Sequence, residues 1–326
     1  MFENKTILIT GSNGTWSREF TKQILLQDPK EIRLFSRNES QQVLMKTDFN
    51  DSRLKFIIGD IRDPKAIKQA CENVEIAIHT AALKHVTICE NQPREAVATN
   101  IYGVQNVIDA CIENEVGQCI NVSTDKVCWP VCMYSKTKAV AEGLIIDANN
   151  QTEFTDFISI RSGNIFGSSG SVVPIWIRQI KEQNYISVTG DRMRRFFITV
   201  EDAVKSTFKA MELSDRGEVF VPKMDCFYIS DLAKVLVEKY GNAKTEIKSI
   251  PPFPYERDKE WLVTPEESQR TIETDDFYIV YPLINIRTTD YPKIKKSHKL
   301  ARGVTMDDAE VSDMDKLREL VRKAGY

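Results

Sequence analysis

The chain has 326 residues, enough for one large domain or two interlocked ones, and its 42% apolar and 28% charged content is ordinary for a soluble globular protein. Its 44 basic and 47 acidic residues leave a net charge of -3, which argues against nucleic acid or a membrane surface as a partner bound through bulk charge. The sequence has no run of about 20 apolar residues, no secretory signal, and no Cys-x-x-Cys pair among its 7 cysteines. We therefore expect a cytoplasmic protein with reduced thiols, no metal site and no membrane partner.

The N-terminal segment predicts a dinucleotide site. An apolar run over residues 6–10 is typical of a buried parallel strand, and apolar residues at helical spacing follow over residues 20–25. The glycine-rich turn between them, with the helix N-terminus, can bind a pyrophosphate through backbone N–H groups and the helix dipole. The Gly-x-x-Gly spacing, with Ser17 as a third small residue, is the variant found in short-chain dehydrogenases/reductases. The residues expected to border the dinucleotide here are Gly11, Asn13, Gly14, Thr15 and Trp16.

The second expected strand, over residues 31–35, ends in Ser36 and Arg37. A site selective for NAD usually has an acidic residue at this point, where it holds the ribose hydroxyls. A hydroxyl and a guanidinium can instead bind a 2′-phosphate, so the sequence predicts NADP as the cofactor. The alternative is that Arg37 is a solvated loop residue.

Strands and helices continue to alternate along the chain. Apolar runs cover residues 54–58, 74–78 and 118–122, and a helix is expected around residues 96–114. This alternation predicts an α/β fold, a Rossmann-type doubly wound parallel sheet with a smaller α/β substrate-binding C-terminal region. Ligands of such sheets bind at the carboxyl ends of the strands. The residues expected there are Asp60 and Ile61 at the adenine, and Ala81 and Ala82 beside the nicotinamide ribose and the phosphates.

Two acid–base pairs follow the strand at residues 118–122. Tyr134 and Lys138 lie one helical turn apart on the same face, so the ammonium can lower the phenol pKa until Tyr134 accepts a proton from an alcohol near neutral pH. Asp125 and Lys126 form the second pair, and two pairs suggest that more than one proton moves. The alternative for Tyr134 and Lys138 is a packed tyrosine beside an exposed lysine, because this spacing occurs by chance in many helices.

Further motifs, together with these pairs, match one family over about residues 1–275. The matching segments are residues 81–86, 123–126, 134–138, 161–168, 171–174, 188–198 and 221–223. On these segments the chain resembles the extended short-chain dehydrogenases/reductases that act on nucleotide sugars. More narrowly, it resembles the UDP-N-acetylglucosamine 4,6-dehydratases that invert carbon 5. Related dehydratases that retain carbon 5 are expected to carry Asp-Glu in place of Asp125-Lys126, so Lys126 indicates the inverting group.

The resemblance implies a mechanism that begins and ends with the same form of NADP. Tyr134, assisted by Lys138, takes the proton of the sugar 4-hydroxyl while carbon 4 gives up a hydride. Lys126 removes the proton on carbon 5 as a neutral amine, which requires a lowered pKa, and Asp125 in its acid form protonates the departing 6-hydroxyl. The hydride then returns to carbon 6, and carbon 5 is reprotonated from the opposite face. Thr124 is expected to hydrogen-bond the 4-oxygen.

The resemblance also implies the remaining site residues. Those that complete the cofactor site are Lys84, Asn100, Ser123, Tyr134 and Lys138. Those that bind the UDP-sugar are Lys84, Thr124, Asn164, Val172, Arg194, Arg195, Arg257 and Glu260. The alternative for each arginine is a surface ion pair, and of the adjacent Arg194 and Arg195 we expect one to reach the pyrophosphate and the other to lie in solvent.

We divide the chain into three parts. Residues 1–163 form the NADP-binding Rossmann domain, with a returning segment at about 196–224; residues 164–195 and 225–285 form the nucleotide-sugar-binding region; residues 286–326 form a tail. Asp313 is a candidate N-cap for a helix with a single apolar stripe in this tail. The stripe can dock on the same subunit or be exchanged across a homo-oligomer interface (dimer, tetramer or hexamer), and the exchange is favoured because enzymes of this class usually assemble.

Two rival functions stay open. A UDP-sugar 4-epimerase or reductase of the same fold would stop after the step at carbon 4, where Lys126 would have no task. A non-catalytic NADP-sensing module would regulate a partner without turnover and would not need both acid–base pairs. The sequence does not distinguish UDP-N-acetylglucosamine from a nearby UDP-sugar.

Overall fold

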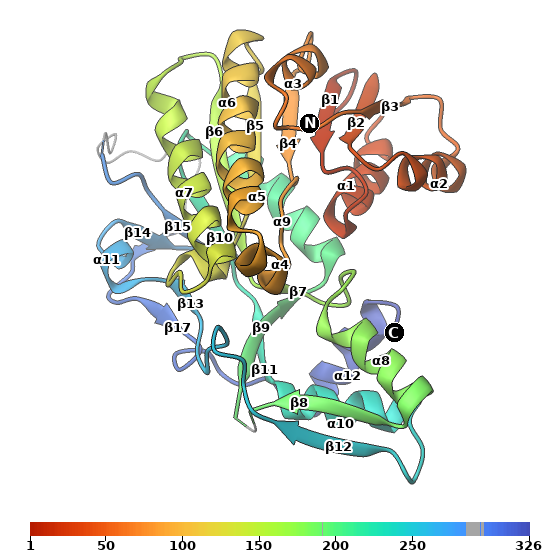
Figure 1. The fold of residues 1–326 in the computed structure, drawn as a ribbon. Coiled ribbons are helices and arrows are strands. Elements are labelled where there is room, and N and C mark those ends of the chain that lie inside the picture. Colours follow the sequence, from red (N-terminus) through yellow and green to blue (C-terminus); the bar gives the residue numbers. More distant parts are fainter. Residues whose placement is uncertain (191, 285–293, 295–296) are drawn as a thin grey trace.

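A computed structural model of the chain describes residues 1–190, 192–284, 294 and 297–326. Asp191, which belongs to one of the family motifs, and the part of the predicted tail at 286–293 and 295–296 lie outside the described residues. Within this part of the chain, the central sheet has ten strands, parallel from β3 to β10 and antiparallel over the three strands beyond it (Figure 1). In spatial order these strands are β3 (Leu54–Ile58), β2 (Glu31–Ser36), β1 (Thr6–Thr10), β4 (Ile76–His79), β5 (Gln118–Thr124), β6 (Asp156–Ser162), β10 (Val219–Pro222), β15 (Phe277–Val280), β14 (Thr271–Glu273) and β16 (His298–Lys299).

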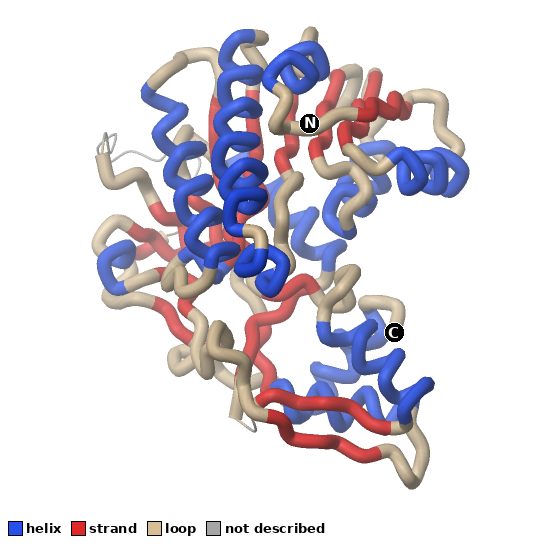
Figure 2. The backbone as a smooth tube through the Cα atoms, in the orientation of Figure 1, coloured by secondary structure: helices blue, strands red, loops and turns tan. Residues whose placement is uncertain are grey.

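Helices cover both faces of this sheet (Figure 2). Every residue of β1 is buried, as expected for a parallel strand between two helical layers. One layer consists of α1 (Thr15–Leu25), α2 (Glu39–Phe49) and α9 (Val200–Leu213). The other consists of α3 (Pro64–Ala70), α6 (Gly103–Glu113) and α7 (Met133–Asp147), with α4 (Val86–Asn91), α5 (Pro93–Val97) and the π-helical turn Ala98–Tyr102 leading into α6. This arrangement confirms the predicted doubly wound fold.

A second, smaller group of elements lies beyond the carboxyl ends of the strands (Figure 1). It contains a three-stranded sheet, a parallel strand pair and three helices that share one apolar core. Its elements are β7 (Asn164–Ile165), β9 (Arg194–Ile198), β11 (Asp225–Tyr228), β8 (Tyr185–Thr189), β12 (Glu246–Ile250), α8 (Val172–Gln183), α10 (Ile229–Tyr240) and α12 (Met314–Lys323). A short pair, β13 (Trp261–Val263) and β17 (Val304–Thr305), with α11 (Pro265–Ser268), connects this group to the central sheet.

The domain boundaries drawn from the sequence stay a prediction, but one segment lies elsewhere than expected. The returning segment supplies α9 and β10 to the central sheet and its cover. β14 and β15, which we assign to the sugar-binding region, instead hydrogen-bond to β10 as a continuation of the central sheet. In the described residues, no helix combines the length and apolar character needed to cross a membrane.

The tail helix forms where its apolar spacing predicts it. Asp313 caps α12 by accepting a hydrogen bond from the backbone N–H of Lys316 at 2.8 Å. Leu317 and Val321 of its apolar stripe are buried in the core that α8 and α10 also form. The stripe therefore docks on its own subunit, and the structure does not show the exchange between subunits that the sequence favours.

Candidate active site

The site forms where β5 ends and two short segments turn across it. β5 runs to Thr124, and Asp125 and Lys126 follow at once in a 3-10 turn, Asp125–Val127. Tyr134 and Lys138 lie in the first two turns of α7, which returns over the same strand end. Because the carboxyl ends of parallel strands face the second group of elements, Asp125 and Lys126 line a cavity of about 710 Å³ between the two.

Asp125, Lys126 and Glu260 form a compact charged cluster in this cleft. Lys126 Nζ lies 3.0 Å from Asp125 Oδ1 and 3.3 Å from Glu260 Oε1. It also donates a hydrogen bond to Asn164 Oδ1 at 3.5 Å. The Thr124 hydroxyl donates to Asp125 Oδ1 at 3.0 Å, so in this structure it holds the carboxylate. The cluster joins the end of β5 to the segment that leads into β13.

The charges in this cluster differ from those expected. Burial disfavours the ammonium of Lys126, but the carboxylates of Asp125 and Glu260 outweigh that effect and raise its pKa. The expectation of a neutral Lys126 is therefore wrong for the resting site. Burial and the negative charge of Glu260 raise the pKa of Asp125 to about 7, in line with an acid form near neutral pH.

Tyr134 and Lys138 lie as predicted but interact differently. The Lys138 ammonium donates a hydrogen bond to the Val122 carbonyl at 2.7 Å, and burial lowers the Lys138 pKa to about 8. Burial raises the pKa of Tyr134, and the cation that opposes this rise is Lys126. The pKa of the phenol is thus raised and not lowered as expected from Lys138, and the cation that acts on it is that of the other acid–base pair.

A second, smaller pocket of about 190 Å³ collects half of the predicted cofactor residues. Gly11 has a φ of +69°, and a Cβ atom on it would lie 2.7 Å from the Cα of Ala81, so only glycine allows this approach of two loops. Buried hydroxyls of Ser12 and Ser123 have no hydrogen-bond partner among the described residues. A tight glycine turn at a helix N-terminus beside such hydroxyls fits a dinucleotide. The predicted residues that line this pocket are Gly11, Asn13, Ser36, Arg37, Asp60, Ile61, Ala81 and Ala82.

The end of β2 has the polar groups that a ribose phosphate would need. The Ser36 hydroxyl accepts a hydrogen bond from Asn13 Nδ2 at 2.8 Å. Arg37 is half-exposed, with Nη1 3.4 Å from Asp60 Oδ2. The guanidinium is thus held at the pocket edge by a weak exposed ion pair and is free to turn toward an anion.

Other predicted cofactor residues do not line either pocket. The Trp16 ring stacks on Phe20 in the apolar core, with ring centroids 5.6 Å apart. Asn100 is fully buried and bonds the backbone of Leu83 at 2.8 and 3.0 Å and Thr137 Oγ1 at 3.0 Å. Its polar atoms therefore hold the loop after β4, so Asn100 would act on a bound cofactor only through this loop. Gly14 is the N-cap residue of α1 and does not line the pocket.

Thr15 and Lys84 instead contact the loop before α8, on the other side of the cleft. The Ser169 backbone accepts a hydrogen bond from Lys84 Nζ at 2.8 Å and donates one to Thr15 Oγ1 at 3.2 Å. These two contacts join the start of α1 and the loop after β4 to the loop before α8. Thr99 is a residue that the sequence analysis missed: it lines the smaller pocket, and its buried hydroxyl has no partner in the described part of the chain. No motif marks it, since it lies inside a helical turn.

The predicted substrate residues divide into two groups. Asn164, Val172, Arg195, Arg257 and Glu260 line the larger cleft. Arg194 points away from it and pairs with Asp307. The missed residues of this cleft come mainly from α8, β8 and the segment before β13. They include Trp176, Gln179, Ser187, Thr189, Phe253, Tyr255 and Glu256, of which Thr189 lies in a matching motif but was not assigned to the site.

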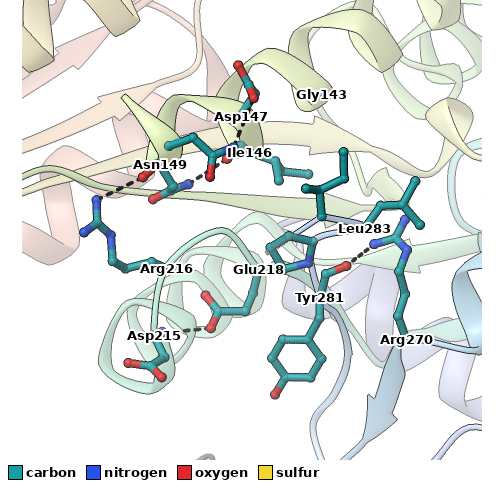
Figure 3. Close-up of a pocket in the computed structure, with 13 residues that line it drawn as sticks. Gly143, Ile146, Asp147, Asn149, Asp215, Arg216, Glu218, Arg270, Tyr281 and Leu283 are labelled. Carbon is teal, nitrogen blue, oxygen red and sulfur yellow. Dashed lines mark hydrogen bonds between the residues drawn. The ribbon is translucent and has the colours of Figure 1, made fainter. Parts of the chain in front are cut away.

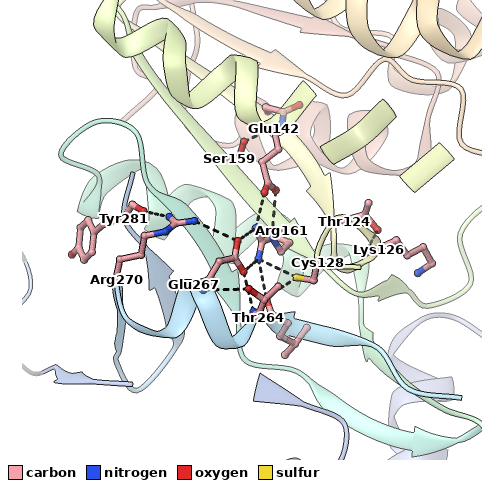
Figure 4. Close-up of polar contacts among 12 residues, drawn as sticks. Thr124, Lys126, Cys128, Glu142, Ser159, Arg161, Thr264, Glu267, Arg270 and Tyr281 are labelled. Atoms are coloured by element: carbon pink, nitrogen blue, oxygen red, sulfur yellow. Dashed lines mark hydrogen bonds and ion pairs between the residues drawn. The ribbon is translucent and has the colours of Figure 1, made fainter. Parts of the chain in front are cut away.

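A buried ion-pair network supports the cleft from behind (Figure 4). Arg161 of β6 is only 2% exposed, and its Nη2 lies 2.6 Å from Glu142 of α7 and 2.7 Å from Glu267 of α11. Its Nη1 donates to the Leu262 carbonyl in β13 at 3.0 Å. The segment that carries Glu260 into β13 is thereby tied to the central sheet.

Another cavity, of about 560 Å³, shares no lining residue with the cleft (Figure 3). Glu218, at its wall, is 3% exposed and accepts a hydrogen bond from the Asp215 backbone N–H at 2.9 Å. Burial raises the pKa of this carboxyl to about 7. The cavity has no residue in common with the predicted site.

Comparisons with known proteins point to one group of sequences. A family model described as polysaccharide biosynthesis protein matches residues 7–282. UDP-N-acetylglucosamine 4,6-dehydratase (inverting) from Campylobacter jejuni is 39% identical over 295 residues, which cover 89% of this chain and 86% of that protein. UDP-glucose 4-epimerase from Rickettsia rickettsii is 35% identical and covers 100% of this chain and 98% of its own length. The X-ray structure of Pen from Bacillus thuringiensis, 36% identical, superposes with a TM-score of 0.92 and covers 99% of this chain and 98% of that one.

Proposed function

This chain belongs to the polysaccharide biosynthesis protein family, and from that membership and the geometry of the cleft we propose that it is an NADP-dependent hydro-lyase. Its reaction is the dehydration of UDP-N-acetylglucosamine to a UDP-4-keto-6-deoxy-N-acetylhexosamine, with inversion at carbon 5. The observation that carries the proposal is the Asp125–Lys126 ion pair at the carboxyl end of β5, inside the cleft and beside Tyr134. The name of the Campylobacter relative supports the same reaction.

Tyr134 is the base for the sugar 4-hydroxyl. Its phenol lies within hydrogen-bonding reach of Thr124, and the Lys126 ammonium favours its ionised form. A bound dinucleotide would supply the hydride acceptor for carbon 4 and the hydride donor for carbon 6. Oxidation at carbon 4 makes the hydrogen on carbon 5 acidic, so the second pair can act only after the first.

Asp125 and Lys126 move the protons of the elimination. One of them accepts the carbon 5 proton and the other protonates the departing 6-hydroxyl, so the pair must begin this step with a single proton to share. With two protons the pair contains no base, and with none it contains no acid. Since Asp125 is buried, Lys126 is partly buried and the two groups lie 3.0 Å apart, the shared proton can take either position within the pair.

The smaller pocket is the proposed site of the dinucleotide. The Gly11 turn and the N-terminus of α1 would hold the pyrophosphate, and Asp60 and Ile61 would border the adenine. Ser36 and Arg37, at the pocket edge, favour NADP over NAD because together they provide a hydroxyl and a guanidinium fork for a 2′-phosphate.

The larger cleft is the proposed site of the UDP-sugar. Arg195 and Arg257 provide positive charge for the diphosphate, and Asn164 provides an amide next to Lys126. Arg257 lies over the Trp129 ring at 4.3 Å, and this stack presents a flat face at the cleft wall. The predicted homo-oligomer and the cytoplasmic location stay predictions.

Proton and carbon NMR of the purified chain in heavy water tests the function. The protein is mixed with UDP-N-acetylglucosamine without added cofactor, and the dinucleotide that co-purifies is identified after denaturation. We expect a 4-keto-6-deoxy product with deuterium at carbon 5 and inverted stereochemistry there, together with bound NADP. The same product from another UDP-sugar alone would keep the mechanism and change the substrate, whereas no turnover of any UDP-sugar would contradict the proposal.

The Rickettsia relative supports a second candidate function, a UDP-sugar 4-epimerase, since it is named UDP-glucose 4-epimerase and matches the whole chain. An epimerase would return the hydride to carbon 4 from the other face and leave the hydrogen on carbon 5 in place. In the same experiment it would yield a 4-epimer with its 6-hydroxyl intact and no deuterium at carbon 5. That outcome would replace the dehydratase by the epimerase.

A further inference from the structure

Glu260 has a position in the cleft that substrate binding alone does not explain. It lies directly before β13, is 9% exposed, and places Oε1 3.3 Å from Lys126 Nζ and 3.6 Å from Arg195 Nε. Its carboxyl group is also within hydrogen-bonding reach of Asp125. Glu260 Oε2 and Asp125 Oδ2 are buried and have no other partner among the described residues.

Two carboxyl groups can share a hydrogen bond only when one of them carries a proton. Arg195 and Lys126 both face Glu260, so Glu260 keeps its negative charge and the proton resides on Asp125. The Lys126 ammonium then has carboxyl oxygens of two residues around it, at 3.0 and 3.3 Å. A third partner, Asn164 Oδ1 at 3.5 Å, completes its three hydrogen-bond directions.

On the basis of the dehydration proposed above, we propose that Glu260 is a positioning residue that fixes the Lys126 ammonium against Asp125 and keeps a second proton on this pair in the resting enzyme. The pair becomes competent when it loses one of its two protons, because only then does it contain both an acid and a base. Glu260 therefore sets the pH above which dehydration proceeds. It acts through Asp125 and Lys126 and need not touch the sugar.

The other groups that face Glu260 do not titrate near neutral pH. Burial raises the pKa of Cys226, in β11, to about 11, so this thiol stays neutral. Burial would raise the pKa of Glu260 itself, but Lys126 and Arg195 outweigh burial and lower it to about 2. Arg257, from the same segment, stays charged, since burial lowers its pKa from a value far above neutral pH.

The test compares the pH dependence of kcat/KM between pH 5.5 and 9 for the wild type and three variants. Glu260→Gln removes the charge and keeps the shape, Glu260→Asp keeps the charge, and Glu266→Gln makes the same chemical change on the exposed surface of α11. We expect the acidic limb of the wild type to have its midpoint near pH 7, the value to which the pKa of Asp125 is raised. In Glu260→Gln this midpoint falls by about one pH unit or more, since a neighbouring negative charge is lost. Glu260→Asp moves back toward the wild type, and Glu266→Gln does not differ from it.

A second readout needs no turnover. The carboxyl carbon of Asp125, identified in 13C NMR of labelled protein by its loss in Asp125→Asn, should titrate near pH 7 in the wild type and lower in Glu260→Gln. If both the limb and this titration stay unmoved while Glu260→Gln loses rate, Glu260 has only a structural role and the inference is overturned. If the titration moves but no UDP-sugar is dehydrated by the wild type, the inference about the pair stands and the proposed function fails.

Discussion

At the scale of single residues, contacts of Lys126 with Asp125 and Glu260 set the charges of the reacting groups at the end of β5. Asp125, Lys126, Tyr134 and Lys138 lie close together in the chain, so strand and helix periodicity alone can bring them to one strand end. Their charges depend on Glu260, which is distant in sequence; the resemblance assigned it to the substrate and did not indicate its contact with Lys126. The expected neutral amine of Lys126 was wrong for this reason.

Lys126→Ala should abolish water loss and leave the dinucleotide bound. The lysine lies in the sugar cleft and does not line the smaller pocket, so the cofactor keeps its contacts while the elimination loses one of its two proton-transfer groups. We expect the rate of dehydration to fall by about 10²- to 10⁴-fold, which NMR of the product measures, with the bound NADP unchanged in the absorbance spectrum. Lys136→Ala, an exposed lysine on α7, is the control and should keep full activity. Dehydration by Lys126→Ala at a rate near that of the wild type would remove Lys126 from its role.

At the scale of elements, one buried arginine holds the cleft wall in place. Arg161 joins β6 to α7 through Glu142 and to α11 through Glu267, and it bonds the backbone of β13. Burial would raise the pKa of Glu267, but Arg161 outweighs burial and lowers it, so the network is ionic. Removing the arginine leaves the buried carboxylate of Glu142 and the largely buried one of Glu267 with only the more distant Arg270, 3.8 Å from Glu267, as a cation, which costs more than the pair itself contributes.

Arg161→Met should therefore lower the free energy of unfolding by about 3–5 kcal/mol at pH 7, measured by urea denaturation. The loss should shrink at low pH, because burial raises the pKa of Glu267 once Arg161 is gone, and protonation of this carboxyl then removes uncompensated charge. Lys205→Ala, which breaks the exposed Lys205–Glu201 pair on α9, should cost about 0.5 kcal/mol or less. A cost for Arg161→Met as small as that of the surface control would show that the network adds little to stability.

At the scale of the whole molecule, the parts predicted well are those set by local pattern. The strand, glycine turn and helix at the N-terminus, the alternation of strands and helices, and the α12 cap each depend on residues near one another in sequence. The pairing of β14 and β15 with the central sheet depends on contacts distant in sequence, which periodicity does not report. The adjacent Arg194 and Arg195 illustrate the same limit: successive strand residues face opposite sides, so the pattern predicts that one enters the cleft but not which one.

Glu218 links the stability of the whole molecule to pH at a point outside the active site. Burial raises its pKa from 4.5 to about 7, so between these values the folded state holds a proton that the unfolded chain has released. The stability contributed by the protonated carboxyl is complete below pH 4.5, declines as the pH rises, and is lost above about pH 7.

A glutamine in place of Glu218 cannot ionise and keeps an acceptor for the Asp215 backbone N–H. Glu218→Gln should thus be more stable than the wild type by about 2–3 kcal/mol at pH 8 and nearly equal to it at pH 4.5, as measured by urea denaturation at the two pH values. Glu212→Gln, an exposed glutamate at the end of α9, should show no such difference. An equal effect of Glu218→Gln at both pH values would indicate a packing change in place of the buried charge.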